Sequence, residues 1–274
     1  MSQAYETLLI EKKGAVDWVT MNRPEALNTL NARLVDDLLD YFAKLYFDRS
    51  VRIVVLRGAG RAFCAGLDIK ESSQRRNEPA PGAPRGGPDA GLYSQRRISE
   101  IVMRMRRCGQ PIVSLVQGPA CGGGFALALA SDIRIAGASM RMNAAFIRIG
   151  LSACDIGVSY FLPRLVGVSV ASELMLTGRF INAERALRVG LVSEVVPDAD
   201  LAKAAEPYIE EMITTAPLGL RLTKECLNMS IDAPSLEAAI NLEDRNQILC
   251  SQTSDVREGM TAFLEKRKPN YTNT

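Results

Sequence analysis

The spacing of apolar and polar residues predicts strands and helices in alternation from the start of the chain. Two short β-rich runs, LLIE and AVDWVTM, flank a Lys-Lys-Gly turn and indicate a hairpin over residues 7–21. A helix is predicted from about 32 to 48, with Asn31 as its N-cap. Its apolar residues recur at helical spacing and define one buried face: Leu34, Leu38, Phe42 and Leu45.

Two longer apolar runs, at 51–58 and 112–118, are typical of strands buried within a parallel sheet. The second run leads into GGGFALALAS, which predicts a buried helix, and then into the strand DIRIAG. Strands alternating with helices favour an α/β fold. From residue 198 onward only amphipathic helices are predicted, with Pro217 and Pro234 suited to helix starts. We therefore expect an α/β core over 1–197 and a helical region over 198–274.

A proline- and glycine-rich stretch at 79–91 interrupts this pattern and predicts an irregular loop, either simply solvated or acting as a lid over a pocket. The helix predicted after it carries arginines on its outer face, which indicate a solvated basic surface or an anion site. Its inner face is apolar: Ile98, Ile101, Val102 and Met105.

The amino-acid composition mainly excludes certain classes of partner and of catalytic site. The 274 residues carry a formal net charge of +2, so no nucleic-acid or membrane partner is expected. No apolar run reaches the roughly 18 residues of a membrane helix, and the N-terminus lacks a signal-peptide pattern. Six scattered cysteines predict buried free thiols in a cytoplasmic protein. The absence of histidine excludes Ser-His-Asp and Cys-His catalysis and histidine-ligated zinc, and we expect no metal.

Two segments carry the candidate chemistry: RAFCAGLDIKE at 61–71 and GPACGGGFALALASDI at 118–133. Each follows a predicted buried strand, and each leads into a helix through small residues that leave backbone N–H groups free. Two such turns side by side would form a two-donor oxyanion hole, which stabilises an enolate or a tetrahedral thioester intermediate. Taken alone, the glycine triplet is equally consistent with close helix–strand packing. Neither segment matches a phosphate-binding or dinucleotide-binding fingerprint.

Over almost its full length the chain resembles the crotonase (enoyl-CoA hydratase/isomerase) family. The shared motifs stand in the family's order: MNRPEALNTLN, VVLRGAGRAFCAGLDIKE, QPIVSLVQGPACGGGFALALASDIRIA, LPRLVG, LTGRFINAERALRVGLVSEVVP and FLEKRKP. The resemblance implies a spiral of β-β-α repeats and a C-terminal helical region used for trimerisation, with a trimer or a dimer of trimers as the assembly. It also implies an acyl-CoA substrate, with coenzyme A arriving as part of that substrate and no separate cofactor.

By position, the resemblance assigns the oxyanion hole to the N–H groups of Leu67 and Gly123. The substrate-binding residues that it implies come from three segments: Ala26; Ala65, Gly66, Leu67, Asp68, Ile69 and Lys70; and Gly122 and Gly123. Within this set, Asp68 is expected to fix its loop rather than contact substrate.

The chain departs from the family's hydratases at both catalytic glutamate positions, which here are Ala126 and Phe146. Between Pro111 and Ser172 only Asp132 and Asp155 are acidic, and Asp132 is expected to be structural. Two roles are predicted for Asp155: the N-cap of a helix over residues 156–166, or a buried acid/base that faces the substrate. The functional hypotheses are therefore an enzyme that hydrates or isomerises an enoyl-CoA, or an acyl-CoA-binding protein without catalysis.

Overall fold

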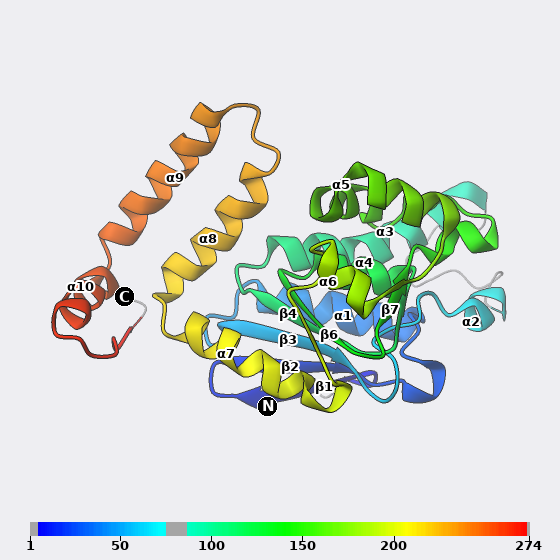
Figure 1. Ribbon diagram of the computed structural model, residues 1–274, viewed down its shortest axis with the longest axis horizontal. Helices are drawn as coiled ribbons and strands as arrows, with labels where there is room; N and C mark the ends of the chain where they lie inside the picture. The colour runs from blue at the N-terminus through cyan, green and yellow to red at the C-terminus, as the bar shows by residue number, and fades with distance from the viewer. Residues whose placement is uncertain (1–4, 75–86, 273–274) are drawn as a thin grey trace.

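The computed structural model describes residues 5–74 and 87–272, and a six-stranded sheet in the order β1-β2-β3-β4-β6-β9 lies at its centre (Figure 1). Its strands are β1 (Leu8–Lys13), β2 (Val16–Met21), β3 (Ile53–Gly58), β4 (Ile112–Val116), β6 (Ile133–Gly137) and β9 (Glu194–Val196). β1 and β2 form the predicted hairpin, and all later neighbours pair parallel. The expected α/β class is confirmed.

A second layer of strands follows the first along the chain. β5 (Pro119–Cys121), β7 (Arg141–Asn143) and β8 (Ile181–Asn182) form a three-stranded sheet. β4 leads directly to β5 and then to a helix, and β6 leads to β7 in the same way. β3 makes a shorter version of this step, because Cys64 forms a single parallel bridge with Ala120 of β5. These successive β-β-α units are the spiral that the sequence predicted.

Helices cover both faces of the six-stranded sheet. The helices of the described residues are α1 (Ala32–Leu45), α2 (Ile69–Gln74), α3 (Gly87–Arg107), α4 (Gly123–Ala130), α5 (Val158–Thr177), α6 (Ala183–Arg188), α7 (Leu201–Ile213), α8 (Pro217–Ser230), α9 (Leu236–Ser251) and α10 (Ser254–Leu264). Alternate residues of β3 point to opposite faces. Val54 and Leu56 pack in one core with α1, α3, α4 and α5, whereas Ile53 and Val55 pack in a second core with α7.

The observed helix starts confirm some of the predictions made from the sequence and contradict others. The Asn31 side chain accepts a hydrogen bond from the Leu34 N–H, so the predicted cap of α1 is confirmed. Residues 87–91 were expected to be irregular but form the first turn of α3, where a proline at the second position costs no hydrogen bond. Most of the predicted loop, residues 79–86, lies outside the described residues. The prediction that this loop acts as a lid concerns those same residues.

The predicted start of the helix near residue 156 is also wrong. α5 begins at Val158, and Gly157, with φ of 83°, is its N-cap without any side-chain cap bond. The Asp155 carboxylate therefore does not cap this helix, and the N-cap role predicted for Asp155 is wrong. α5 extends to Thr177 through a break at Gly167.

The helical region after residue 198 begins on the sheet and then leaves it. α7 packs on the second core, whereas α8, α9 and α10 extend to one side of the body (Figure 1). α8 starts at Pro217 as predicted, but the N-cap of α9 is Ser235 rather than Pro234. No helix in the described ranges is long and apolar enough to span a membrane.

Lys224 of α8 fastens this region to the core. Its side chain is 5 % exposed, and its ammonium lies 2.8 Å from an Asp132 carboxylate oxygen. It also donates to the carbonyl oxygens of Met105, at 3.0 Å, and Gln110, at 2.8 Å. Asp132 in turn accepts a hydrogen bond from the Ile112 N–H at 2.8 Å. The expected structural role of Asp132 is confirmed.

Replacing Lys224 by Met should lower the free energy of unfolding by about 3 kcal/mol, because Asp132 and two carbonyl groups would lose their buried partner. The exposed Lys203 on α7 offers the matched control, since Lys203→Met removes a charge that makes no buried contact. Denaturant titration followed by circular dichroism measures both variants. Equal stabilities would show that Lys224 does not anchor α8.

Candidate functional site

The first candidate turn is held by the segment that precedes α1. Leu27 and Asn28 have φ of 52° and 55°, and this bend turns the buried Asn28 side chain toward the turn after β3. The Asn28 amide donates to the carbonyl oxygens of Ala59, at 2.9 Å, and Ala62, at 2.8 Å. Since Asn28 is fully buried and bonded at both ends of its side chain, residues 23–30 and 59–62 form one rigid unit.

The Leu67 N–H is free because the residues on either side of it take the available partners. Leu30 forms a parallel bridge with Leu67, in which the Leu30 N–H donates to Gly66 at 2.7 Å. The Asp68 N–H donates back to Leu30 at 3.0 Å. In such a bridge the N–H of the central residue points to the opposite side. Within the described part of the chain, no hydrogen bond uses the Leu67 N–H.

The second turn lies directly against the first. The Cys121 N–H donates to the Cys64 carbonyl at 3.0 Å. A Cβ built on Gly66, whose φ is 101°, would lie 2.8 Å from the Cys121 carbonyl oxygen and 3.8 Å from the Gly123 nitrogen. Gly123 is the first residue of α4, where an N–H has no intrahelical acceptor, and no other described residue accepts from it. The structure thus brings together the two segments that the sequence singled out.

The glycine triplet is required by packing as well as by exposure of the backbone. A Cβ on Gly124 would lie 1.9 Å from the Cys64 carbonyl oxygen, so α4 could not approach the first turn with any larger residue there. Gly122 has φ of 50° and ψ of −114°, a conformation that a side chain strongly disfavours. At Gly123, a Cβ would meet only the end of the Leu30 side chain at 2.7 Å and Ile156 at 3.7 Å. Close packing and the free N–H therefore coexist in the same three residues.

Asp155 is linked to this pair of turns through its chain neighbour Ile156, whose side chain lies 3.7 Å from the Cβ position of Gly123. The side chain is partly buried, and Gln95 of α3 donates to its Oδ1 at 2.5 Å. Burial raises the pKa of Asp155 above its ordinary value, while hydrogen bonds from the Ile156 N–H and from Gln95 oppose that rise. A carboxyl group with a raised pKa can both accept and return a proton.

Other titratable groups near the turns are engaged or protonated. Burial raises the pKa of Cys64 to about 12 and that of Cys121 to about 11, so both thiols stay protonated at neutral pH. Tyr160 donates its hydroxyl hydrogen bond to Asp232, which is the main cause of its raised pKa. Asp132 lies beyond the far end of α4, paired with Lys224. These contacts leave Asp155 as the best-placed carboxylate.

Ala126 and Phe146, the positions that the resemblance assigns to the hydratase glutamates, both hold buried apolar side chains. Ala126 is fully buried in α4, one helical turn from Gly122, to which its N–H donates. Phe146 belongs to the 3-10 helix Ala145–Ile149, and its ring lies 3.4 Å from the Cβ position of Gly122. An apolar wall therefore borders the free N–H groups on this side.

The remaining expected substrate-binding residues surround the first turn. Ala26 ends the 3-10 helix Pro24–Ala26, and the Ala65 N–H donates to the adjacent Leu27 carbonyl at 3.0 Å. Ile69 and Lys70 are exposed at the start of α2. Ala26 and the 65–70 segment thus line one continuous surface.

Asp68 has the structural role that the sequence suggested. It pairs with Arg23 at 3.0 Å and accepts hydrogen bonds from the Thr29 hydroxyl and the Glu71 N–H. Burial alone would raise the pKa of Asp68, but the bonds from Glu71, Arg23 and Thr29 together lower it below its ordinary value. A carboxylate held ionised by three donors fixes its loop and has little capacity left for a substrate.

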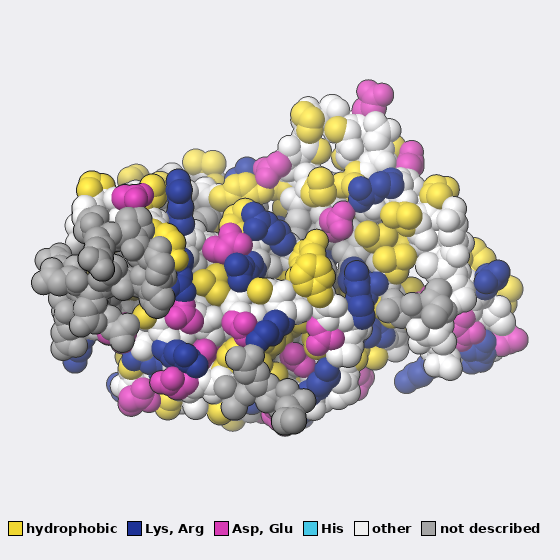
Figure 2. Space-filling model, turned by 180° about the vertical axis from the view of Figure 1, so that it is seen from behind, with side chains coloured by type: hydrophobic (Ala, Val, Ile, Leu, Met, Phe, Trp, Pro, Cys, Tyr) yellow, Lys and Arg dark blue, Asp and Glu magenta, His cyan; other side chains and the backbone are white. Residues whose placement is uncertain are grey.

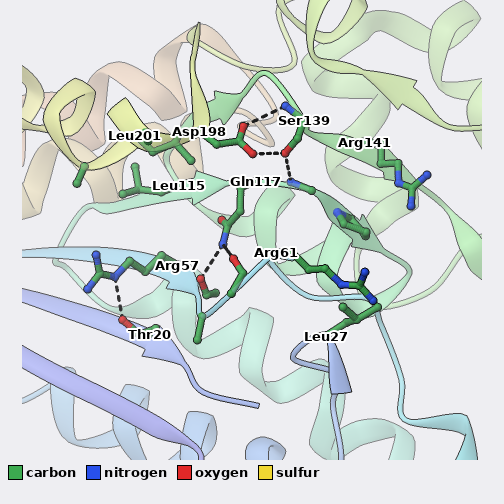
Figure 3. A pocket seen from close by; sticks show the side chains of 17 residues that line it. Thr20, Leu27, Arg57, Arg61, Leu115, Gln117, Ser139, Arg141, Asp198 and Leu201 are labelled. Carbon is green, nitrogen blue, oxygen red and sulfur yellow. Dashed lines mark hydrogen bonds between the residues drawn. The ribbon is translucent and has the colours of Figure 1, made fainter. Parts of the chain in front are cut away.

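A cavity of about 980 Å³ lies elsewhere, at the carboxyl ends of β2, β3 and β4 on the side of α7 (Figure 3). Gln117 donates to the carbonyl oxygens of Gly58, at 2.7 Å, and Gly60, at 3.1 Å. Ser139 accepts from the Gly118 N–H and donates to Asp198. Neither free N–H group nor Asp155 lines this cavity. Its polar side chains instead hold the turn that leads from β3 toward Leu67.

Known proteins share both the sequence and the fold of this chain. The family described as enoyl-CoA hydratase/isomerase matches residues 11–274. A probable enoyl-CoA hydratase of Mycobacterium tuberculosis is 40 % identical over 256 residues, covering 93 % of this chain and 88 % of its own. The 1,2-epoxyphenylacetyl-CoA isomerase of Escherichia coli is 35 % identical, with 97 % and 98 % covered. The crystal structure of a putative enoyl-CoA hydratase from Streptomyces coelicolor superimposes with a TM-score of 0.92 at 34 % identity, covering 100 % of this chain and 97 % of that one.

The chain belongs to the enoyl-CoA hydratase/isomerase family. The predicted crotonase resemblance and its fold are thereby confirmed, and the activity is of the enoyl-CoA hydratase/isomerase type. In this family member, no group of three or more candidate metal ligands occurs among the described residues. Lysine and arginine side chains alternate with acidic ones over the face seen in Figure 2.

One polar residue of this enzyme's site was missed by the sequence reasoning. Gln95 lies in a helix that was predicted for its apolar face and its arginines, and glutamine has no charge or period that marks it as functional. Only the packing of α3 beside the segment before α5 brings it to Asp155, 60 residues away in the chain. Two arginines of that helix contact the body of the fold: Arg104 donates to the Leu39 carbonyl at 2.7 Å, and Arg106 lies 3.7 Å from an Asp132 carboxylate oxygen.

Proposed function

We propose that the protein isomerises the double bond of an enoyl-CoA, with Asp155 moving the proton. The observation that carries this is the partly buried Asp155 carboxylate, whose pKa is raised by burial and whose chain neighbour Ile156 lies against Gly123, together with the free N–H groups of Leu67 and Gly123. Ala65 to Lys70 and Ala26 would lie along the coenzyme A portion of the substrate. Because coenzyme A arrives with the substrate, the reaction requires no separate cofactor.

The proposed reaction begins with a 3-enoyl thioester whose carbonyl oxygen accepts hydrogen bonds from Leu67 and Gly123. The ionised Asp155 takes a proton from the α-carbon, and the electron pair moves onto the thioester oxygen as a dienolate. The two N–H donors stabilise that negative charge. Asp155 then returns its proton to the γ-carbon, which leaves the double bond between the α- and β-carbons. One carboxyl group performs both transfers, and no water is consumed.

Hydration is less well supported because it requires a water molecule to be positioned and activated as well as a proton to be delivered. The residues at the two hydratase glutamate positions, Ala126 and Phe146, transfer no protons, and their apolar side chains disfavour an ordered water there. The names of the relatives include both hydratases and an isomerase, so they do not separate these reactions. Phe146 and Ala126 also support a second candidate, an acyl-CoA-binding protein without catalysis.

We further infer that the chain assembles as a trimer or a dimer of trimers through its C-terminal helices. α8, α9 and α10 extend from the body with little of their own chain against them (Figure 1). Their large apolar side chains are strongly exposed: Leu227, Met229, Leu236, Ile248, Met260, Phe263 and Leu264. Exposed apolar area of this extent is typical of a surface covered by another subunit.

The oxyanion-hole assignment is tested at Gly123 by comparing proline with alanine. Both residues add a Cβ that meets the end of the Leu30 side chain, but only proline removes the N–H, and proline is compatible with the first position of a helix. We expect Gly123→Pro to be at least 100-fold slower than Gly123→Ala, in line with the loss of one oxyanion donor. Equal rates for the two folded variants would refute the assignment.

The role of Asp155 is tested by Asp155→Asn, with the exposed Asp200→Asn as control. Turnover of a 3-enoyl-CoA, followed by the absorbance of the conjugated thioester, should fall by roughly 100-fold or more. In the native protein, activity should be lost as the pH falls through the raised pKa of Asp155, because the ionised form is the base. Acyl-CoA affinity should persist in the variant.

The same variant carries a stability readout. Because burial favours the protonated form of Asp155, ionisation costs folding stability as pH rises through that pKa. The melting temperature of Asp155→Asn at neutral pH should therefore equal or exceed that of the native protein. An active Asp155→Asn variant, or a native protein that hydrates crotonyl-CoA faster than it isomerises 3-enoyl-CoA, would overturn the proposed reaction. Binding without either reaction would favour the second candidate.

For the assembly, light scattering at micromolar concentration should give three or six times the chain mass of 29.9 kDa. The double variant Phe263→Glu with Leu264→Glu places two charges on the exposed end of α10 and should shift the mass toward the monomer. A native protein with the mass of one chain would contradict the assembly.

A further inference from the structure

The contact between Gln95 and Asp155 joins two parts of the chain that pack together only in the folded protein. The Gln95 Nε2 donates to Asp155 Oδ1 at 2.5 Å. Both side chains are partly buried. The bond therefore lies where solvent competes with it only in part.

α3 presents Gln95 from a rigid support. Arg97, two residues further on, pairs with Asp36 of α1, and Arg104 bonds the Leu39 carbonyl at 2.7 Å. The residues on the same stripe of the helix as Gln95 pack into the main core: Ile98, Val102 and Met105. The helix that carries the Gln95 amide is therefore fixed both by polar contacts with α1 and by apolar packing in the core.

The side-chain bond uses one carboxylate oxygen. Asp155 Oδ1 accepts from Gln95, and among the described residues no other side chain donates to the carboxylate, whose second donor is the Ile156 N–H. The backbone around the carboxylate is also fixed, since the Asp155 carbonyl accepts from the Val158 N–H at 2.9 Å and Ile156 has φ of 47°. A carboxylate fixed at its backbone and at one oxygen has a defined direction for the other oxygen.

We propose that Gln95 is a positioning residue, whose amide holds Asp155 Oδ1 so that Oδ2 faces the reacting carbons of the acyl group. This inference rests on the proposed function of Asp155. Gln95 itself does not contact the substrate carbons, and it acts through the geometry and the protonation state of the carboxylate. A purely structural tie between α3 and the segment before α5 would not need to end on a partly buried acid.

The protonation state of Asp155 depends on few groups. Burial raises its pKa, and the hydrogen bonds from the Ile156 N–H and Gln95 lower it. Among the described residues no charged side chain, from α3, α4 or α5, contributes to this balance. Loss of the Gln95 bond should accordingly raise the pKa of Asp155, and a second carboxylate in its place should raise that pKa further.

The test compares Gln95→Leu and Gln95→Glu with Ser94→Ala in the full-length protein. Leucine keeps much of the volume and removes the donor, whereas glutamate keeps the shape and adds a like charge. Ser94 is exposed, and its hydroxyl bonds only the Ala90 carbonyl of its own helix. With a 3-enoyl-CoA substrate, kcat of Gln95→Leu should fall about 10-fold through misorientation of the base, with KM nearly unchanged. The acid limb of its pH–rate profile should move up by about one pH unit.

Gln95→Glu should move the acid limb further still, and Ser94→Ala should match the native enzyme in rate and profile. A carbon-13 carboxyl titration of Asp155 gives the same pKa without relying on activity. A native rate, profile and titration in folded Gln95→Leu, alongside an inactive Asp155→Asn, would overturn the positioning role and leave the proposed function intact. An active Asp155→Asn would instead overturn the proposed function and this role with it.

Discussion

Backbone pairing between Leu30 and the segment around Leu67 determines how the site is built. Because Gly66 and Asp68 give their carbonyl and N–H groups to Leu30, the N–H between them is turned away from the bridge. α4 packs closely against the other side of this segment. A Cβ built on Gly124 would lie 1.9 Å from the Cys64 carbonyl oxygen. Asn28, buried and bonded to both Ala59 and Ala62, keeps the turn from relaxing. A free backbone donor next to a rigid neighbour needs no reorganisation when charge develops on a bound oxygen.

The repeated β-β-α step explains why donors from distant parts of the sequence meet. Each strand of the large sheet continues into a short strand or single bridge of the second layer and then into a helix. Parallel neighbours place equivalent points of successive repeats side by side, so the turn after β3 and the turn after β4 are adjacent although they are more than 50 residues apart. Asp155 belongs to the next repeat, between β7 and α5, and its neighbour Ile156 lies against Gly123.

Apolar side chains border the two glycine-containing turns on the side of Ala126 and Phe146. Among the described residues, Gln95 and Asp155 form a polar pair between α3 and the segment before α5. An apolar wall raises the pKa of a carboxyl group and excludes water, whereas an amide donor limits that rise. Together they suit a carboxyl group that must both take and return a proton. In the proposed reaction, the pKa of Asp155 is set by burial and by two hydrogen bonds, from the Ile156 N–H and from Gln95, without a charged neighbour.

The sequence by itself determined the α/β class, the hairpin, the buried parallel strands, the capped start of α1 and the two glycine-containing turns. These features follow from local rules, since apolar periodicity, caps and turn residues act within a few positions of the chain. The family resemblance added the roles of Leu67 and Gly123 and the implied surface at Ala26 and 65–70. Local rules failed where backbone conformation was set by packing. The N-cap of α5 is Gly157 rather than Asp155. The left-handed conformation at Ile156 and Gly157 turns the chain so that Ile156 faces Gly123. Only the tertiary structure could reveal Gln95, since a neutral side chain on a helix acquires its role from the partner that folding places beside it.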